Sequence, residues 1–155
     1  MKQHPVLPRH IAIRYSDKFG TTIELHNQVA QDRGLVWFGK MGTRLAASWI
    51  DVFQKQLAAD VDTYVYLVKR DTSQYVMHKG KLLQISRQPP EPGSGLPKYY
   101  FDNDLIKNMS CFFQLECLVA CTKNEMMRLK LQSSGGTLLE TLSSSMNGLF
   151  IVINP

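Results

Sequence analysis

The sequence predicts one α+β domain over residues 1–155, built on a small, curved mixed β-sheet that closes into a half-barrel with helices outside it. Short apolar runs typical of strands alternate along the chain with amphipathic stretches typical of helices. The strands are too short, and the loops too varied, for a doubly wound parallel sheet. The chain has no internal repeat and no change of composition, so we expect a single hydrophobic core.

Composition and charge narrow the class of protein. Hydrophobic residues make up 44% of the chain, which predicts a folded domain rather than disorder. No apolar run approaches the roughly 18 residues of a membrane span, and no apolar segment follows the N-terminus as in a secretory signal. The three cysteines lie in one segment, which favours a reducing, cytoplasmic location without a membrane partner. The net charge of +5 mildly favours a polyanionic partner.

The first elements are a strand and a helix. His10–Tyr15 alternates apolar and polar residues, as a half-buried strand does. Thr21 and Glu24 have the spacing of a capping box, in which each side chain binds a free amide at a helix start. The helix then runs to about Arg33, because Gly34 is suited to a left-handed C-cap.

The segment Gly34–Lys40 is a short apolar strand that ends in two adjacent aromatics, Trp37 and Phe38. Neighbouring side chains on a strand point to opposite faces, so one ring is expected in the core and the other in a pocket or at the surface. The alternative is that both rings are buried in the core. Gly39–Gly42 is predicted to form a bend before the next element.

The second half of the chain adds a helix, several strands and a long irregular loop. Residues 88–97 hold four prolines and two glycines, a composition that excludes regular structure. Thr137 and Glu140 again have capping-box spacing and predict a short helix. The periodicity predicts a helix over Leu45–Leu57 and strands over Thr63–Lys69, Tyr75–His78, Leu82–Ile85, Cys111–Ala120, Met127–Leu131 and Leu149–Ile153.

Enzyme signatures are absent from the sequence. It contains no GxGxxG, phosphate-loop, GxSxG or HExxH motif, so we expect no catalysis and no cofactor. Cys111, Cys117 and Cys121 lack the CxxC spacing of a metal site and share one face of a predicted strand, which favours core cysteines. A small enzyme acting through Cys117 or His78 is the alternative with the least support.

Aromatic and basic residues occur together at strand ends and after the proline-rich loop. Such a combination suits nucleic acid, since bases stack on rings while cations contact phosphates. We expect Trp37 to be the ring that faces a ligand and Phe38 to be the core residue. The other residues in this group are Tyr99, Tyr100, Lys40, Arg44 and Lys98.

The order of these elements over roughly residues 9 to 131 resembles the YTH and EVE domains of the PUA-like superfamily. The segment after Trp37, Phe-Gly-Lys-Met-Gly, departs from both family patterns, and no tryptophan is present for the second wall of a pocket. The residues that carry the resemblance are Arg9–Ser16, Gly34–Trp37, Asp62–Leu67, Gly80–Ile85 and Lys98–Asp102.

The resemblance implies a pocket that takes a modified or flipped base of DNA or RNA, with no catalysis. Trp37 would be one wall, Tyr99 or Tyr100 the second, and the backbone of Phe38 would approach the base edge. Polar contacts would come from Arg14, Tyr15 and Ser16, and phosphate contacts from Lys40, Arg44 and Lys98.

In bacteria, such a domain would fit as the targeting part of a restriction or defence system. An effector protein, or a larger parent chain, would then supply the catalytic function. The alternative is a phage or host interaction factor that binds a protein through the same aromatic surface.

Overall fold

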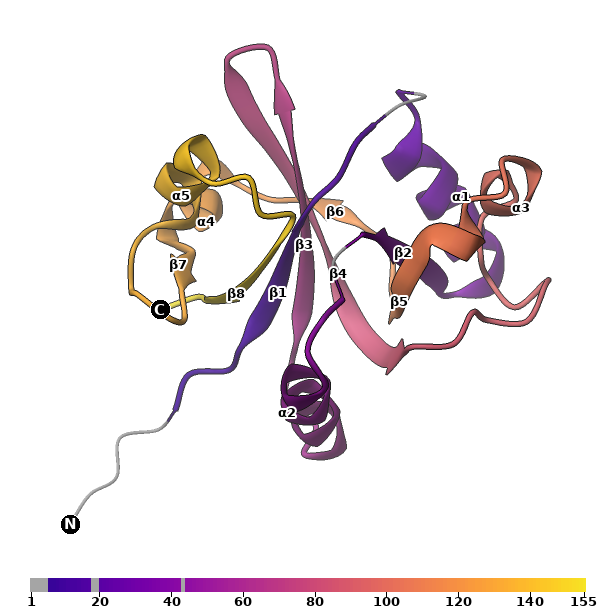
Figure 1. The fold of residues 1–155 in the computed structure, drawn as a ribbon, viewed down its shortest axis with the longest axis horizontal. Helices are drawn as coiled ribbons and strands as arrows, with labels where there is room; N and C mark the ends of the chain where they lie inside the picture. Colours follow the sequence, from indigo (N-terminus) through magenta and orange to yellow (C-terminus); the bar gives the residue numbers. More distant parts are fainter. Residues whose placement is uncertain (1–5, 18–19, 43) are drawn as a thin grey trace.

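The computed structural model describes residues 6–17, 20–42 and 44–155, and within them the fold is mixed α+β (Figure 1). The predicted α+β class is therefore confirmed. The strands are β1 (His10–Arg14), β2 (Val36–Met41), β3 (Tyr64–Asp71), β4 (Gln74–Ser86), β5 (Met109–Leu115), β6 (Val119–Ala120), β7 (Lys130–Leu131) and β8 (Leu149–Ile153). The helices are α1 (Thr22–Arg33), α2 (Ala47–Ala58), α3 (Tyr99–Asp102), α4 (Lys123–Arg128) and α5 (Leu138–Ser144), with a 3₁₀ turn over Ile106–Asn108.

The described strands form one sheet in the order β2-β5-β4-β3-β1-β8-β7, with β6 beside β4. Only the pair β1 and β3 is parallel among these pairings. The long strand β4 pairs with β3 and β6 through its first part and with β5 through its last part. Gly80 lies between these parts, where an added Cβ would lie 3.1 Å from Leu118. The strands predicted on either side of Gly80 are thus one continuous strand.

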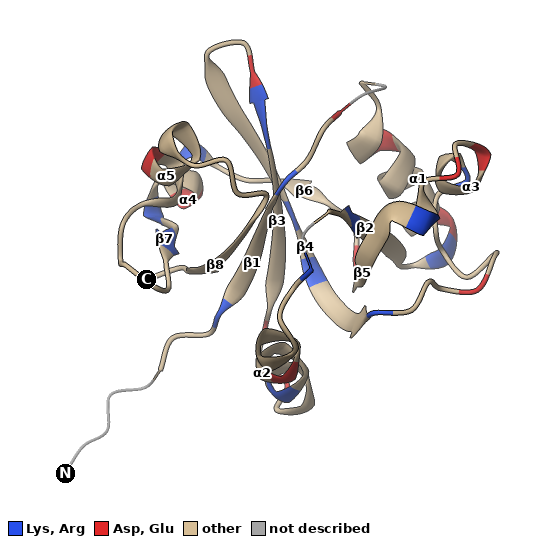
Figure 2. Ribbon diagram, viewed as in Figure 1, with Lys and Arg blue, Asp and Glu red and all other residues tan. Residues whose placement is uncertain are grey.

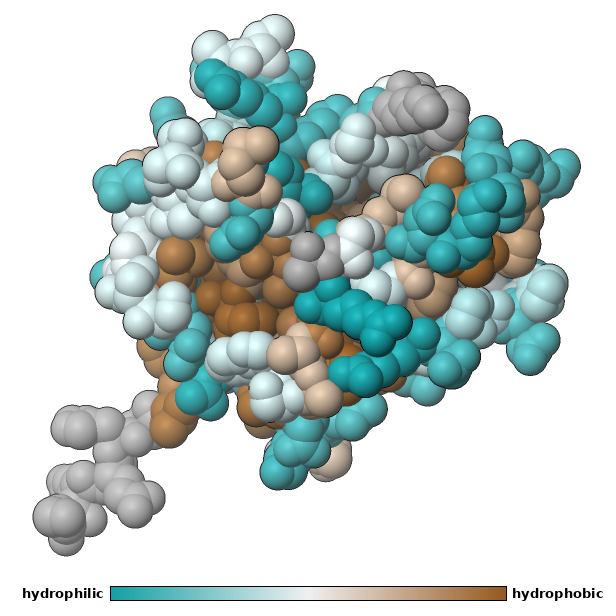
Figure 3. Space-filling view, viewed as in Figure 1, coloured by the Kyte–Doolittle hydropathy of each residue, from teal (hydrophilic) through white to brown (hydrophobic). Residues whose placement is uncertain are grey.

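The helices cover the sheet in separate groups (Figure 1). α1 and α3 lie beside β2 and β5, α4 and α5 lie beside β7 and β8, and α2 lies below the central strands. A large core joins the sheet to α1 and α2, and a second core lies under α4 and α5. In the space-filling view, hydrophobic surface stays visible over β1 and β8 above α2 (Figure 3). Within the described part of the chain, no helix has both the length and the apolar character needed to cross a bilayer.

Helix ends account for several differences from the prediction. Gly34 caps α1 with a φ of 80°, as predicted. Thr21, however, makes no side-chain cap, and the Asp17 carboxylate instead accepts a hydrogen bond of 3.1 Å from the backbone amide of Thr22. The helix start predicted at Thr137 is confirmed, because the Thr137 hydroxyl accepts from the amide of Glu140 at 3.4 Å.

The region after β5 differs most from the prediction. The strand expected over Cys111–Ala120 is broken, because residues 116–118 lie between β5 and β6. The strand expected over Met127–Leu131 is instead the end of α4 followed by β7, since Thr122 caps α4 by accepting from the amide of Glu125 at 3.2 Å. The break also separates the cysteines, so Cys111 is buried while Cys117 is exposed.

The free edge of β2 is covered by the proline-rich loop and α3. β2 runs straight through the bend expected at Gly39–Gly42, and it pairs with β5 as far as Met41. On its other edge, the Trp37 amide donates to the Gly95 carbonyl at 2.9 Å and the Gly39 amide donates to the Tyr100 hydroxyl at 3.2 Å. Both amides would otherwise be unsatisfied, so this contact fixes α3 against β2.

Gly39→Ala should lower the free energy of unfolding by about 1–3 kcal/mol, the usual cost of overpacking. An added Cβ would overlap the sulfur of Met109 and lie 3.1 Å from the Tyr100 ring. Denaturant unfolding measures the loss, and Gly136→Ala is the control because its Cβ would meet only the Ser134 hydroxyl at 3.4 Å. Equal stability of the two variants would contradict the close packing at Gly39.

Candidate functional site

A cavity of about 510 Å³ lies between the end of β1, the end of β2, α3 and the start of β5. Its volume falls in the range of about 300–1,000 Å³ that is common for small-ligand pockets. The lining combines apolar, aromatic and basic side chains and includes no aspartate or glutamate. The lining residues are Ile13, Arg14, Tyr15, Ser16, Thr22, Phe38, Gly39, Lys40, Met41, Tyr99, Tyr100, Asn103, Leu105 and Met109.

The aromatic part of the lining comes from Tyr15 after β1, from Phe38 on β2 and from Tyr99 and Tyr100 on α3. The rings of Tyr99 and Tyr100 pack edge to face with centroids 4.7 Å apart. Tyr100 is almost completely buried, and Phe38 is 5% exposed. These rings are held by the protein core, so the cavity offers aromatic surfaces that are already in place before a ligand arrives.

His26 on α1 holds Tyr100 of α3 in place through a hydrogen bond. One ring nitrogen, Nδ1, lies 2.7 Å from the Thr22 carbonyl, which can only accept, so this nitrogen carries the proton. Burial lowers the pKa of His26 to about 4, so the ring is neutral at pH 7 and the other nitrogen, Nε2, accepts from the Tyr100 hydroxyl at 2.7 Å. Because that hydroxyl also accepts from the Gly39 amide, one buried chain of hydrogen bonds joins α1, α3 and β2.

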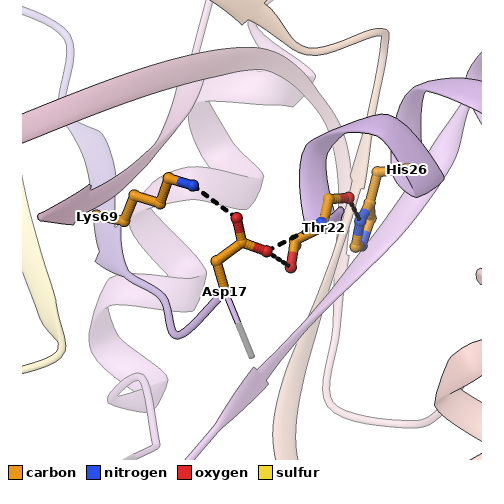
Figure 4. A network of polar contacts seen from close by, with 4 residues as sticks. All are labelled: Asp17, Thr22, His26 and Lys69. Carbon is orange, nitrogen blue, oxygen red and sulfur yellow. Dashed lines mark hydrogen bonds and ion pairs between the residues drawn. The ribbon is translucent and has the colours of Figure 1, made fainter. Parts of the chain in front are cut away.

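A second polar network holds the start of α1 beside the cavity (Figure 4). The Asp17 carboxylate accepts from the Thr22 hydroxyl at 2.7 Å and from the Lys69 ammonium at 2.6 Å. Burial alone would raise the pKa of Asp17, but the hydrogen bonds from Lys69 and Thr22 outweigh it and lower the pKa to about 2. Asp17 is therefore ionised at neutral pH, and its charge is balanced by Lys69.

Two cations line the cavity without a carboxylate partner. Lys40 and Arg14 form no ion pair with any described residue. Lys40 is only 8% exposed; its ammonium donates to the Met41 carbonyl, and burial lowers its pKa. Figure 2 shows the basic segments of β1 and β2 near one another at the same end of the sheet. An anion in the cavity would meet both charges.

Two donors of the cavity residues have no partner within the described chain. The Arg14 guanidinium donates through Nη2 to the Leu142 carbonyl at 2.6 Å, but its Nε is buried and unpaired. The Tyr15 hydroxyl is likewise buried and unpaired. Burial, and then the charge of Asp17, raises the pKa of Tyr15 to about 12, so the hydroxyl keeps its proton at neutral pH.

Seven of the residues expected in the pocket or at phosphates line this cavity together. They are Arg14, Tyr15, Ser16, Phe38, Lys40, Tyr99 and Tyr100.

Trp37, Arg44 and Lys98 do not line it. Trp37 is 7% exposed and lies under the proline-rich loop against Leu96, Tyr100 and Phe112. Arg44 is exposed, and the Lys98 side chain is 88% exposed with Asp102 4.0 Å away.

Trp37 and Phe38 therefore exchange the roles expected from the sequence. Strand alternation places them on opposite faces, as predicted, but the proline-rich loop covers the Trp37 face and leaves the Phe38 face toward the cavity. The loop position depends on the hydrogen bond between Trp37 and Gly95, which no local pattern in the sequence reveals.

No pattern in the sequence singles out His26, Asn103, Leu105 or Met109 as cavity residues. His26 had the helical spacing of an ordinary helix residue, and the other three follow α3 in a segment of mixed composition. Their roles arise only from contacts between distant segments, such as the pair of His26 with Tyr100. No group of three or more potential metal ligands occurs among residues 6–17, 20–42 and 44–155.

Acidification should weaken the fold between about pH 6.5 and pH 4. Burial lowers the pKa of His26, and of His10 near the start of β1, to about 4. The unfolded chain takes up these protons first, so stability is complete above about pH 6.5 and is lost as pH falls toward the folded pKa. Each shift corresponds to about 3 kcal/mol, which denaturant unfolding at several pH values measures.

His26→Gln tests which histidine is responsible. The variant should start from a lower stability at neutral pH, yet its loss of unfolding free energy over this pH range should be smaller by about half. An unchanged pH dependence would contradict a neutral, buried His26.

Lys40→Met should raise the free energy of unfolding at neutral pH by about 1–2 kcal/mol, because it removes a desolvated cation that has no carboxylate partner. Thermal or denaturant unfolding measures the gain. Lys55→Met is the matched control, since the Lys55 side chain is 77% exposed and its pair with Asp51 contributes little. A loss of stability in Lys40→Met would show that the ammonium is well solvated.

Comparisons with family models, with curated proteins and with solved structures found no match to this chain, so its function has to be argued from the cavity and its residues.

Proposed function

We propose that this chain is a non-catalytic nucleic-acid-binding module that takes one modified or flipped base into the cavity beside β2. The observation that carries the proposal is the lining itself. Four aromatic side chains and two cations line the cavity, and the lining includes no carboxylate. A nucleotide has the matching chemistry, because a flat base is joined to an anionic phosphate.

The aromatic surfaces would replace the stacking that a base loses when it leaves its neighbours. Unstacking costs a few kcal/mol, and stacking on an aromatic side chain returns about 1–3 kcal/mol per base. Phe38, Tyr99 and Tyr100 are fixed by packing and by the His26 hydrogen bond, so little ordering is needed on binding. The Asn103 amide and the Tyr15 hydroxyl are available for the polar edge of the base.

The cations would hold the phosphate of the same nucleotide. Arg14 and Lys40 both lie close to Gly148: its carbonyl accepts from the Arg14 backbone amide at 2.9 Å, and a Cβ added to it would lie 3.5 Å from the Lys40 ammonium. Their charges are not balanced by acids, so an anion would lower the cost of keeping them partly buried. Binding of this kind weakens steeply as salt rises, because counterions are released.

A modification would be read by the apolar part of the lining. Leu105 and Met109 offer contact to a methyl group, and one buried methyl contributes about 0.8 kcal/mol. Discrimination by a larger factor requires a hydrogen bond that the unmodified base fails to make.

The resemblance to YTH and EVE domains supports the same site, since it points to the end of the first strand and to the aromatic strand β2. It also supports a half-barrel, in which β4 links the two parts of the curved sheet, and a targeting role beside an effector.

An interaction factor is the second candidate. Met41, at the cavity mouth, is 45% exposed, and Phe101 on α3 is 39% exposed, so the apolar rim offers contact to a peptide side chain. Such binding would depend weakly on salt, whereas nucleic-acid binding would fall steeply with it. A salt titration therefore separates the two candidates.

Phe38→Leu should weaken binding of single- and double-stranded oligonucleotides by about 5- to 150-fold, equivalent to losing one base stack of 1–3 kcal/mol. The panel contains marked and unmarked bases, and fluorescence anisotropy at two salt concentrations measures affinity. Trp37→Leu is the matched control on the same strand: it loses an aromatic ring outside the cavity, so stability falls while affinity is kept. Equal affinities of the folded Phe38→Leu variant and the unaltered protein would refute base stacking in this cavity.

A further inference from the structure

A second cavity, of about 310 Å³, lies beside the first, where the β3–β4 hairpin meets the end of α5. Its lining contains basic and hydroxyl side chains together with a few apolar ones, and no aspartate or glutamate. The lining residues are Arg14, Val68, Lys69, Arg70, Tyr75, Leu142, Ser143, Ser144, Ser145 and Met146.

Arg14 belongs to both cavities and joins them. It is the last residue of β1, and the parallel register places it beside Val68 of β3. Its guanidinium donates to the Leu142 carbonyl at 2.6 Å, so the cation also offsets the negative carbonyl end of α5. The shared side chain lies where the phosphate of a bound nucleotide would leave the first cavity.

The charge of the second cavity comes mainly from Arg70. Lys69 is already paired with Asp17 at 2.6 Å. Arg70 is exposed at the end of β3 and makes no ion pair with the described residues. Figure 2 shows basic segments at the ends of β3, β1 and β2 on one side of the sheet. Lys40, Arg14 and Arg70 thus form a track of unpaired cations across both cavities.

We infer that the second cavity binds the phosphodiester of the neighbouring nucleotide, so that a nucleic-acid strand crosses the protein from Lys40 over Arg14 to Arg70. This inference rests on the proposed function and adds a second contact to it. The Ser145 hydroxyl accepts from the Asn147 amide at 3.1 Å, which leaves its own proton to donate to a phosphate oxygen. Tyr75 provides an aromatic contact for the adjoining sugar or base. The protein would therefore prefer a strand to a single nucleotide.

Arg70→Gln tests the second cavity alone. The probes are nucleoside monophosphates, which reach only the first cavity, and short single-stranded DNA and RNA oligonucleotides, which reach both. The variant should bind oligonucleotides about five- to tenfold more weakly and bind monophosphates as before. The slope of log affinity against log salt should fall by about 0.7–0.9, the value for one phosphate contact.

Arg87→Gln is the matched control. Arg87 is also exposed, but it follows the last residue of β4, at the other end of that strand from the β3–β4 hairpin, and it lines neither cavity. Ser144→Glu is a second test at an exposed position, and its added negative charge should weaken oligonucleotide binding at least as much as Arg70→Gln. Circular dichroism confirms that each variant is folded.

The outcomes separate this inference from the proposed function. If monophosphates bind while Arg70→Gln and Arg87→Gln bind oligonucleotides equally well, the second cavity is not a phosphate site and the proposed function stands. If neither monophosphates nor oligonucleotides bind the unaltered protein, the proposed function fails and the inference fails with it. A selective loss in Arg70→Gln supports both.

Discussion

The hydrogen bond between His26 and Tyr100 is the contact on which the cavity depends. It joins α1 to the neighbouring α3, and the same tyrosine hydroxyl accepts a hydrogen bond from the Gly39 amide at the free edge of β2. A free strand edge exposes backbone donors that need partners, and here a side chain supplies one where a neighbouring strand is missing. Burial lowers the pKa of His26 to about 4 and so keeps the imidazole neutral at pH 7, with its proton on Nδ1 facing the Thr22 carbonyl.

The cavity places groups together that lower the stability of the folded chain. Lys40 is nearly buried without an acidic partner, and Arg14 and Tyr15 each leave a donor unpaired. Groups of this kind cost free energy unless something compensates them. The neighbouring ion pair of Asp17 with Lys69 shows the contrasting case, in which each charge is balanced. A ligand that supplies negative charge to the cavity would compensate the Lys40 ammonium and the unpaired Arg14 donor together.

The sequence predicted the fold class, the C-cap at Gly34 and seven of the residues around the cavity, because these depend on local patterns or on strand ends. The prediction failed where contacts between distant segments determine the structure. Alternation placed Trp37 and Phe38 on opposite faces, but the loop that covers Trp37 is held to β2 by the hydrogen bond from Trp37 to Gly95 and by the packing of Leu96. The alternation of apolar residues from Met127 predicts a strand. The segment instead begins as the end of a helix, because the Thr122 hydroxyl caps α4 at its start.

The sheet topology explains why cations gather at one end. β1 and β3 are parallel neighbours, so their carboxyl ends lie at the same edge and bring Arg14 close to the end of β3, where Arg70 lies. β2 ends at the first cavity, which adds Lys40. In open sheets with parallel strands, ligands commonly bind beyond the carboxyl ends of those strands. Backbone ends and unpaired cations coincide here, so the two cavities are better understood as parts of one extended surface than as separate pockets. A ligand that occupied only the larger cavity would leave Arg70 without a negative counter-charge.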